Sequence, residues 1–270
     1  MSENCKSKTL KNMHKTANIL DFNVFSRQKS ELLIKIKNHL FSKKEPLIIF
    51  TPNAEQLVQA KQNPNFNRYL KQANILIPDG ISLVWASRLL AEAGQSEPII
   101  ERIAGVDLVK DLIELTQELG LKVLVIGGQG YEQVVPQAKK VKNYWQLAGN
   151  IFWTAGYQNV SQAQKNEIAQ LRQVIKELRP EVVLVAFGAP AQEKWIIEQL
   201  SLLTASEVKL VMAVGGAFDM LLGKIKRAPA WLQHLGLEWL FRLIQEPWRW
   251  RRQLRLIKFV RLVIKQKKIA

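Results

Sequence analysis

The sequence predicts an α/β fold: a mostly parallel, Rossmann-like sheet with helices on both faces, followed by a basic amphipathic helical appendage at the C-terminus. Apolar runs of strand length alternate with segments of helical spacing, and strands buried on both faces of a parallel sheet have this continuous apolar pattern. Lysine and arginine are concentrated between Phe241 and Ala270. We therefore expect a polar tail over 1–15, an α/β core over 16–237 and the appendage over 238–270.

Apolar runs define the strands, and apolar positions three or four residues apart define the helices. The expected strands are 17–24, 47–50, 75–77, 123–126, 150–153, 182–187 and 209–214. The expected helices are 29–41, 54–61, 81–90, 106–119, 131–144, 162–178 and 192–200. No internal repeat or low-complexity linker interrupts this series, so we assign it to one domain.

The composition excludes several classes of protein. With 270 residues, of which 47% are hydrophobic and 23% charged, the chain is globular and long enough to bury a sizeable core. A single cysteine, Cys5, excludes an internal disulfide framework and a cysteine-ligated metal site. No apolar run reaches the roughly 18 residues of a membrane span, and the N-terminus lacks the apolar region of a secretory signal. We expect a cytoplasmic protein, and its formal net charge of +16 favours an anionic partner.

Five of the expected strands end on small, polar or turn-forming residues. They lead into Thr51-Pro52-Asn53, Pro78-Asp79-Gly80, Gly127-Gly128-Gln129-Gly130, Gly188-Ala189-Pro190-Ala191-Gln192 and Gly215-Gly216-Ala217-Phe218-Asp219. The carboxyl ends of parallel strands lie at one edge of the sheet, where ligands bind in open α/β folds. Glycine there lets backbone N–H groups and helix N-termini approach an anion closely. These strand ends predict a nucleotide-phosphate site.

Asp79 has two interpretations. A carboxylate at the end of a buried strand lies on the rim where chemistry occurs, but aspartate at a turn is also a common helix cap, here for the helix 81–90. This segment alone favours the cap. The other polar strand ends at the same edge favour a role in the site.

Motifs for other nucleotide enzymes and for metal sites are absent from the sequence. It has no G-x-G-x-x-G fingerprint with a following acidic residue, no Walker A segment, no H-E-x-x-H and no D-x-D pair. A bound diphosphate then needs cationic side chains and helix dipoles in place of a metal. Arg102 and Arg227 flank the loops and supply that charge, with an ordinary surface ion pair as the alternative for each.

Larger pieces of the sequence match one enzyme family in order and spacing. They are Thr51-Pro-Asn53-Ala-Glu55, Pro78-Asp79-Gly80, Glu101-Arg102-Ile-Ala-Gly105-Val-Asp107, Val125-Ile-Gly127-Gly128, Gly156-Tyr157, Ala186-Phe-Gly188-Ala-Pro190-Ala-Gln192-Glu193, Gly215-Gly216-Ala-Phe218-Asp219, Arg227-Ala-Pro229 with Trp231, and Gly236-Leu-Glu238-Trp239-Leu-Phe-Arg242 through Glu246-Pro247. From about Leu47 to Arg252 the chain thus resembles the WecG/TagA/CpsF glycosyltransferases (glycosyltransferase family 26). One departure is Ala191, where family members usually carry a basic residue.

The resemblance implies an inverting, metal-independent hexosyltransferase without a cofactor. It would move an N-acetylmannosamine-type sugar from a UDP-sugar to a polyprenyl-diphosphate-linked sugar, in the synthesis of a cell-surface polysaccharide or a teichoic-acid-type polymer. The catalytic residues that it implies are Asp79 as general base, Arg102 offsetting charge on the diphosphate, Gln192 orienting hydroxyl groups, and Thr51. The implied substrate-binding residues are Asn53, Gly80, Gly105, Gly127, Gly128, Gly188, Pro190, Gly215, Gly216, Asp219, Arg227, Arg242, Arg249 and Arg252. We assign Glu193 to a helix start, where the dipole favours its charge.

The C-terminal segment combines positive charge with amphipathicity. Between Phe241 and Ala270, ten lysines and arginines stand against one acid, Glu246. At 100° per residue, the expected helix has an apolar face and an opposite cationic face: Leu256, Phe259, Val260, Val263 and Ile264 against Arg251, Arg255, Lys258, Arg261 and Lys265. Trp231, Trp239, Trp248 and Trp250 lie just before or at its start.

This pattern predicts a helix lying on an anionic membrane surface. Since the family's acceptor is a membrane lipid, we expect a peripheral protein at the inner face of the cell membrane. The first alternative is a helix docked on the core or on a sister subunit of a homo-oligomer. Nucleic acid ranks last, and we expect no nucleic-acid partner. Truncation after about residue 237 is expected to abolish transfer and to leave the core folded.

Two rival functions remain. One is another nucleotide-using α/β enzyme, such as an epimerase or dehydrogenase, and the missing dinucleotide fingerprint argues against it. The other is a non-catalytic module that binds membrane or nucleic acid through its basic tail. A binding module does not need Asp79, Arg102 and Gln192 on one rim, which argues against the second.

Overall fold

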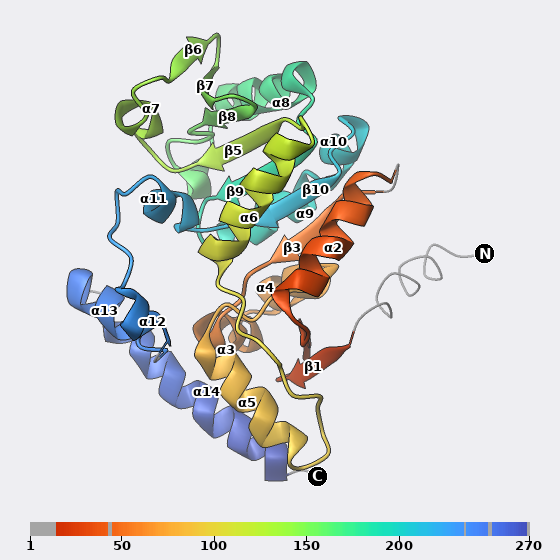
Figure 1. Ribbon diagram of the computed structural model, residues 1–270, viewed down its shortest axis with the longest axis vertical. Helices are drawn as coiled ribbons and strands as arrows, with labels where there is room; N and C mark the ends of the chain where they lie inside the picture. Colours follow the sequence, from red (N-terminus) through yellow and green to blue (C-terminus); the bar gives the residue numbers. More distant parts are fainter. Residues whose placement is uncertain (1–14, 43–44, 235, 248–249, 269–270) are drawn as a thin grey trace. The chain divides into compact units, whose positions relative to one another are not determined.

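The computed structural model describes residues 15–42, 45–234, 236–247 and 250–268 (Figure 1). The chain forms two compact units. The first comprises Met1–Glu31, Thr51–Ala104 and Lys226–Ala270, and the second comprises Leu32–Phe50 and Gly105–Ile225. Both contain strands and helices, which confirms the α/β class.

The first unit has a short sheet with the strand order β1-β2-β4. Its strands are β1 (Thr16–Ile19), β2 (Phe22–Phe25) and β4 (Ile75–Leu76). β1 and β2 form an antiparallel hairpin whose turn residues, Leu20 and Asp21, have positive φ angles of 51° and 65°, while β2 pairs with β4 in parallel. The single strand expected over 17–24 is wrong, because a two-residue left-handed turn of the type that suits hairpin twist folds it in two.

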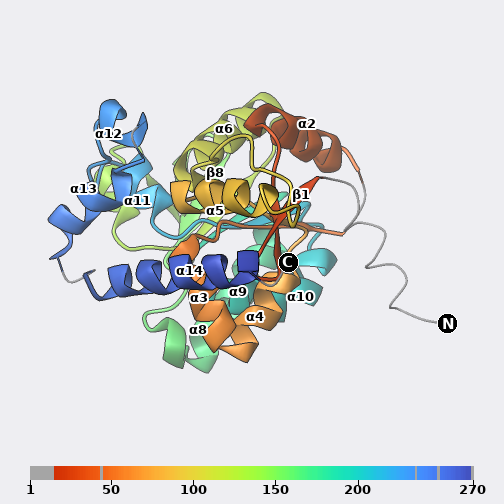
Figure 2. The ribbon, with the colours of Figure 1, turned by 90° about the horizontal axis from the view of Figure 1, so that it is seen from below.

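The helices of the first unit are α3 (Ala54–Gln62), α4 (Pro64–Lys71), α5 (Ile81–Ala91), α12 (Ala230–His234), α13 (Glu238–Gln245) and α14 (Trp250–Lys268). α14 lies along α3 and α5 (Figures 1 and 2). Phe259 and Val263 of α14 are completely buried, and Arg255 donates to Glu55 of α3 at 2.8 Å. The face of α14 that contains Phe259 and Val263 is therefore docked on the core, which was the alternative to membrane binding.

The opposite side of α14 is open to solvent. Trp250, Leu254 and Ile257 are each more than half exposed. Ile264, expected on the same apolar face as Phe259, is 41% exposed. At 100° per residue these four positions form a stripe opposite the buried one. The expected placement of Ile264 is therefore wrong, and α14 has two apolar stripes of which only one is covered.

The second unit has the strand order β3-β10-β9-β5-β8-β7-β6. Its strands are β3 (Leu47–Phe50), β5 (Val123–Gly127), β6 (Lys139–Val141), β7 (Tyr144–Ala148), β8 (Ile151–Thr154), β9 (Val182–Ala186) and β10 (Leu210–Ala213). Neighbours from β3 to β8 are parallel, and β8, β7 and β6 are antiparallel. β5 and β10 are buried along their whole length, as their continuous apolar sequences predict.

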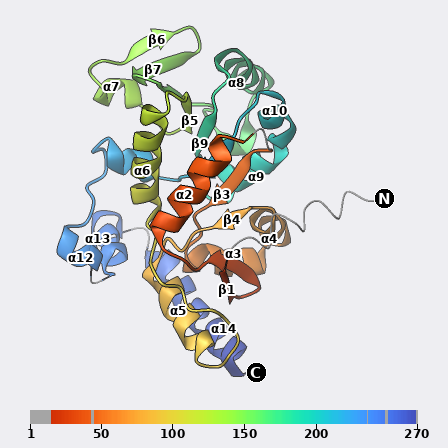
Figure 3. The ribbon, with the colours of Figure 1, turned by 45° about the vertical axis from the view of Figure 1, so that its right-hand side comes forward.

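Helices cover both faces of this second sheet, as expected. They are most of α2 (Lys29–Leu40), α6 (Gly105–Glu118), α7 (Tyr131–Val134), η1 (Val160–Gln162), α8 (Lys165–Leu178), α9 (Ala191–Glu198), α10 (Leu200–Ala205) and α11 (Ala217–Leu221). α2 and α6 lie on one face, and α8, α9 and α10 lie on the other (Figures 2 and 3). Among the described residues of both units, no helix is long and apolar enough to cross a membrane.

The helix expected over 131–144 is wrong. α7 ends at Val134, and Val135 is extended, with φ −108° and ψ 100°. The cause is Pro136, which lacks an N–H group and disfavours helical geometry at the preceding residue. The chain continues into the hairpin of β6 and β7, where Lys142 has a positive φ of 51°.

Candidate functional site

In the first unit, Asp79 follows β4 and precedes α5. The N-cap residue of α5 is Gly80, which makes no side-chain cap hydrogen bond. The interpretation of Asp79 as the cap is therefore wrong. Asp79 is half-buried, and its role as a carboxylate on the rim stays a prediction.

Asn53 lies beside the Asp79 turn. A Cβ atom on Gly80 would lie 3.8 Å from the Cβ of Asn53. Asn53 also forms a capping box with α3: its Oδ1 accepts from Gln56 N at 3.0 Å, and Gln56 Oε1 accepts from Asn53 N at 3.1 Å. Thr51 begins the same connection. The structure thus brings two of the expected strand ends together.

Arg102 is attached to the main chain of this turn. Its Nε donates to the carbonyl oxygen of Asp79 at 3.0 Å. The next residue, Ile103, donates from its backbone N to the carbonyl oxygen of Pro78 at 3.1 Å. Two consecutive residues of one segment therefore bond two consecutive residues of the other, which fixes Arg102 relative to Asp79.

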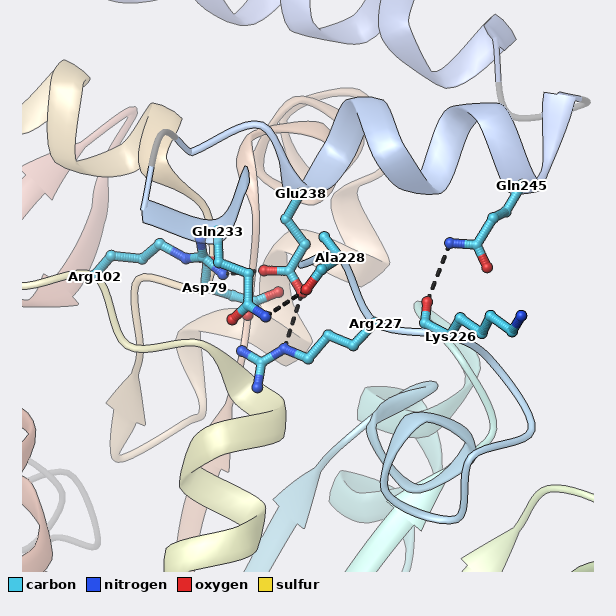
Figure 4. A network of polar contacts seen from close by, with 8 residues as sticks. All are labelled: Asp79, Arg102, Lys226, Arg227, Ala228, Gln233, Glu238 and Gln245. Atoms are coloured by element: carbon cyan, nitrogen blue, oxygen red, sulfur yellow. Dashed lines mark hydrogen bonds and ion pairs between the residues drawn. The ribbon is translucent and has the colours of Figure 1, made fainter. Parts of the chain in front are cut away.

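Glu238, in the first turn of α13, joins two arginines (Figure 4). Its Oε2 accepts from Arg102 Nη2 at 2.5 Å, and its Oε1 accepts from Arg227 Nε at 3.3 Å. The side chains of Arg102 and Glu238 are 18% exposed and that of Arg227 is 25% exposed. The alternative interpretation of both arginines was a surface ion pair. They do form ion pairs, but within a largely buried cluster. No role was predicted for Glu238, because it lies 136 positions from Arg102 and no local pattern connects them.

The arginines expected to reach the acceptor diphosphate are less well defined. Arg242 donates from Nε to Glu246 Oε2 at 2.9 Å, one turn along α13. Arg249 lies outside the described residues, and Arg252 belongs to α14 with a side chain outside them. Their role in binding stays a prediction. Within the described ranges, no group of three or more histidine, cysteine, aspartate or glutamate side chains is placed to hold a metal ion.

In the second unit, Gly127 and Gly128 end β5 with positive φ angles of 98° and 74°. A Cβ atom on Gly127 would come within 2.9 Å of the main chain of Ala186 in β9, and one on Gly128 would overlap the Tyr131 ring. Trp153 Nε1 donates to the carbonyl oxygen of Gly127 at 2.8 Å. Close packing at the end of β5 therefore requires both glycines.

Tyr131 and Asp219 form a second polar group in this unit. Tyr131 is completely buried, stacked on Phe218 with ring centroids 5.7 Å apart. Burial and then the nearby Asp219 carboxylate raise the pKa of Tyr131. Lys224 Nζ lies 5.4 Å from the centroid of the same ring. No role was predicted for Tyr131, because its segment was interpreted only as part of the expected helix 131–144.

Gln192, near the start of α9, links two of the glycine turns. Its Oε1 accepts from the backbone N–H groups of Gly188, at 3.2 Å, and Gly215, at 3.1 Å. Its Nε2 donates to Glu193 Oε1 at 2.9 Å. The remaining expected residues of this unit stand at helix starts: Pro190 is the N-cap of α9, Gly216 is the N-cap of α11 and Gly105 is the first residue of α6. The amide of Gln192 therefore holds the ends of β9 and β10 together.

Glu193 lies in the first turn of α9, as expected, but burial dominates its electrostatics. It is 2% exposed, and burial raises its pKa from 4.5 to about 7, against the lowering effect of the Gln192 hydrogen bond. Between pH 4.5 and about 7 the unfolded chain loses this proton while the folded protein keeps it. The free energy of unfolding therefore falls as pH rises through this window, by a maximum on the order of 3 kcal/mol.

We expect Glu193→Gln to remove this loss, because glutamine keeps the acceptor for Gln192 and does not ionise. The Tm difference between variant and wild type should grow in favour of the variant from pH 5 to pH 8, measured by thermal denaturation. Glu167→Gln is the control with a different pH window: backbone hydrogen bonds from Gln158 and Gln164 lower the pKa of Glu167 below 4.5, so both states of the wild type are ionised there and the Tm difference of this variant should stay nearly constant from pH 5 to pH 8. A Tm difference independent of pH would refute the buried-acid assignment of Glu193.

Comparisons with known proteins identify relatives over most of the chain. The sequence model of the glycosyl transferase WecG/TagA/CpsF family matches residues 17–270. An N-acetylglucosaminyldiphosphoundecaprenol N-acetyl-beta-D-mannosaminyltransferase from Bacillus subtilis (strain 168) is 31% identical over 235 residues, which cover 86% of this chain and 85% of the relative. A protein of the same name from Bacillus spizizenii (strain ATCC 23059 / NRRL B-14472 / W23) is 32% identical over 222 residues, covering 82% and 80%.

Proposed function

The chain belongs to the WecG/TagA/CpsF family of glycosyltransferases, and we propose that it transfers an N-acetylmannosamine-type sugar from a UDP-sugar to a polyprenyl-diphosphate-linked N-acetylglucosamine. The names of both Bacillus relatives describe, for those proteins, transfer of an N-acetyl-beta-D-mannosaminyl group to N-acetylglucosaminyldiphosphoundecaprenol. The observation that carries the proposal is the cluster at the end of β4, where Asp79 lies beside Arg102 and the Arg102–Glu238–Arg227 ion pairs.

In this proposal Asp79 is the general base. It takes the proton of the acceptor hydroxyl while that oxygen attacks the anomeric carbon of the donor. The bond between the anomeric carbon and the UDP oxygen breaks on the opposite face, and its electron pair stays with the diphosphate, which inverts the anomeric configuration. A half-buried carboxylate suits this step because it is accessible to a hydroxyl and is still partly shielded from water.

Arg102 and Arg227 offset the negative charge that develops on the departing diphosphate. Guanidinium groups are suited to this task because they stay ionised and donate several hydrogen bonds in one plane. Thr51 and Asn53 belong to the neighbouring strand end, with Asn53 beside the Asp79 turn. In the second unit, a nucleotide-binding role for the glycine turns, Gln192 and Asp219 stays a prediction.

A transfer assay with the purified full-length protein tests this function. It pairs UDP-N-acetylmannosamine with a short-chain polyprenyl-diphosphate N-acetylglucosamine in the presence of EDTA. We expect product, because the diphosphate charge is offset by arginines. Absence of product with EDTA and its return with added Mg²⁺ would contradict metal independence. Absence of both product and UDP-induced thermal stabilisation would reject the proposed function.

We also propose that the protein binds the anionic inner face of the cell membrane, where a polyprenyl acceptor resides. Support comes from the exposed stripe of α14, defined as Trp250, Leu254, Ile257 and Ile264. The cationic residues Lys258, Arg261 and Lys265 are exposed on the same helix, and Trp231 of α12 and Ile244 of α13 are exposed by 62% and 71%. Apolar and cationic side chains together suit an interface between lipid headgroups and acyl chains.

Changing the exposed stripe should weaken membrane binding without affecting stability. For the double variant Leu254→Gln and Ile257→Gln, we expect roughly tenfold weaker co-sedimentation with phosphatidylglycerol-containing vesicles, because each side chain contributes buried apolar area at the interface. The matched control is Ile34→Gln, since Ile34 of α2 is 62% exposed, against 55% for Leu254 and 54% for Ile257. Equal vesicle binding by wild type and the double variant would rule out this stripe as the contact.

A further inference from the structure

We propose that Glu238 is a positioning residue for sugar transfer, whose carboxylate orients Arg102 and Arg227 and thereby ties α13 to the Asp79 turn. The inference rests on the proposed function, since orientation of these arginines matters for catalysis only if the Asp79 cluster performs the transfer. The C-terminal region would then contribute a functional carboxylate, in addition to its many lysines and arginines.

The first step of the argument is the orientation of Arg102. Its Nε is held by the carbonyl oxygen of Asp79, and its Nη2 is held by Glu238 Oε2. The two acceptors belong to segments far apart in the sequence. Because the guanidinium group is planar and rigid, two acceptors on different sides fix its plane as well as its position. Without Glu238, only the Nε–H bond to Asp79 remains, and the planar group can pivot as a whole about that hydrogen bond.

The second step concerns the repulsion between the two arginines. Arg102 and Arg227 each bond one oxygen of the same carboxylate, so their positive charges are held near each other. All three side chains are at least three-quarters buried, where solvent and salt screen charges less than at the surface. The carboxylate offsets this repulsion, and its removal drives the two guanidinium groups apart.

The third step is a contact that involves no charge. Gly236, in the turn before α13, has a positive φ of 71°. A Cβ atom at this position would lie 3.0 Å from Cγ2 and 3.2 Å from Cβ of Ile81, the first residue of α5. The turn before α13 is therefore fitted against the residue that follows Asp79 and Gly80. Glu238 reaches the cluster from a backbone that is itself anchored beside the Asp79 turn.

These contacts predict a loss of preorganisation when Glu238 is changed. In Glu238→Gln, the amide NH₂ group replaces one acceptor oxygen with a donor, so only one arginine can keep its bond. We expect kcat to fall by roughly tenfold or more, because the charge on the departing diphosphate is then met by misplaced groups. Glu238→Asp keeps the charge on a shorter stem and should retain an intermediate rate.

The matched control is Glu55→Gln. Glu55 accepts from Arg255 at 2.8 Å and joins α14 to α3, so this variant also removes the carboxylate charge from an arginine–carboxylate pair between the C-terminal region and the rest of the first unit, away from Arg102. Steady-state kinetics, Tm and amide hydrogen exchange are measured on all three variants of the full chain. Exchange at Ile103 N, which bonds Pro78, should speed up in Glu238→Gln and stay at the wild-type rate in Glu55→Gln.

The outcomes separate the role of Glu238 from the proposed function. A lower kcat with faster exchange at Ile103 in Glu238→Gln, but not in Glu55→Gln, supports positioning. Wild-type kcat with a lower KM for the donor would overturn it, because Glu238 would then occupy the place of the diphosphate and compete with it. Equal losses of kcat in Glu238→Gln and Glu55→Gln would show that Glu238 has only a structural role, in holding α13 in place. Failure of the wild-type protein to transfer sugar would reject the proposed function, while unchanged exchange at Ile103 would reject the positioning role independently.

Discussion

Replacement of Asp79 by asparagine is expected to lower the rate of sugar transfer by about 10²- to 10⁴-fold, the usual contribution of a general base. Asparagine has nearly the same shape as aspartate but cannot accept the proton of the acceptor hydroxyl. The fold should be unaffected, because Gly80 rather than Asp79 is the N-cap of α5 and because Arg102 bonds the main-chain oxygen of residue 79. The transfer assay with saturating donor and acceptor measures the effect as a change in kcat.

Two controls make this result specific. The variant should keep the wild-type Tm and the wild-type stabilisation by UDP, since neither depends on the base. Asp21→Asn is the matched substitution: Asp21 forms an exposed ion pair with Lys61 at 2.6 Å, and asparagine tolerates the left-handed backbone that this turn residue adopts. Near-normal kcat in Asp79→Asn would remove Asp79 from the role of base.

The sequence predicted the parallel strands of the second unit well, because strands buried on both faces have a continuous apolar sequence. Val123–Gly127 and Val182–Ala186 are examples. The sequence-based prediction was wrong where a proline or a tight turn interrupts a segment whose apolar spacing suggests one continuous element. Pro136 ends the helix expected over 131–144, and the turn at Leu20 and Asp21 divides the strand expected over 17–24.

The candidate site was predictable where a motif lies at a strand end. Asp79 and the glycine turns were proposed in this way, since the topology of a parallel sheet places such residues at a known edge, and their roles stay predictions. Glu238 was not, because its contact with Arg102 spans 136 positions. Gln192 was predicted to contact a ligand, and the structure adds its bonds to Gly188 and Gly215, which no pattern along the sequence indicates.

The C-terminal helix illustrates a further limit of periodicity. The spacing of apolar residues placed Phe259 and Val263 together, and the structure confirms that they share a face. Periodicity indicates that a face will be covered but does not identify what covers it. Here α3 and α5 cover the face, so the proposed membrane contact is restricted to the opposite stripe of α14.

Removal of residues 238–270 is therefore expected to destabilise the first unit, which revises the expectation that a truncated core stays folded. Truncation uncovers the surfaces of α3 and α5 that pack against Phe259 and Val263. A single change, Phe259→Ala, should already cost about 3–5 kcal/mol and lower the Tm by roughly 10 °C. The truncated protein should lose at least as much or fail to fold, as measured by thermal and urea denaturation.

Ile257→Ala is the matched control for this prediction, because Ile257 lies on the same helix and is 54% exposed. Its substitution should change the free energy of unfolding by about 0.5 kcal/mol or less. If the truncated protein keeps the wild-type Tm, α14 does not contribute to the fold in solution. Truncation removes Glu238, the packing of Phe259 and the exposed stripe of α14 together. Loss of transfer after truncation is thus expected on three separate grounds, and only the point variants at Glu238, Phe259, Leu254 and Ile257 distinguish catalysis, folding and membrane binding.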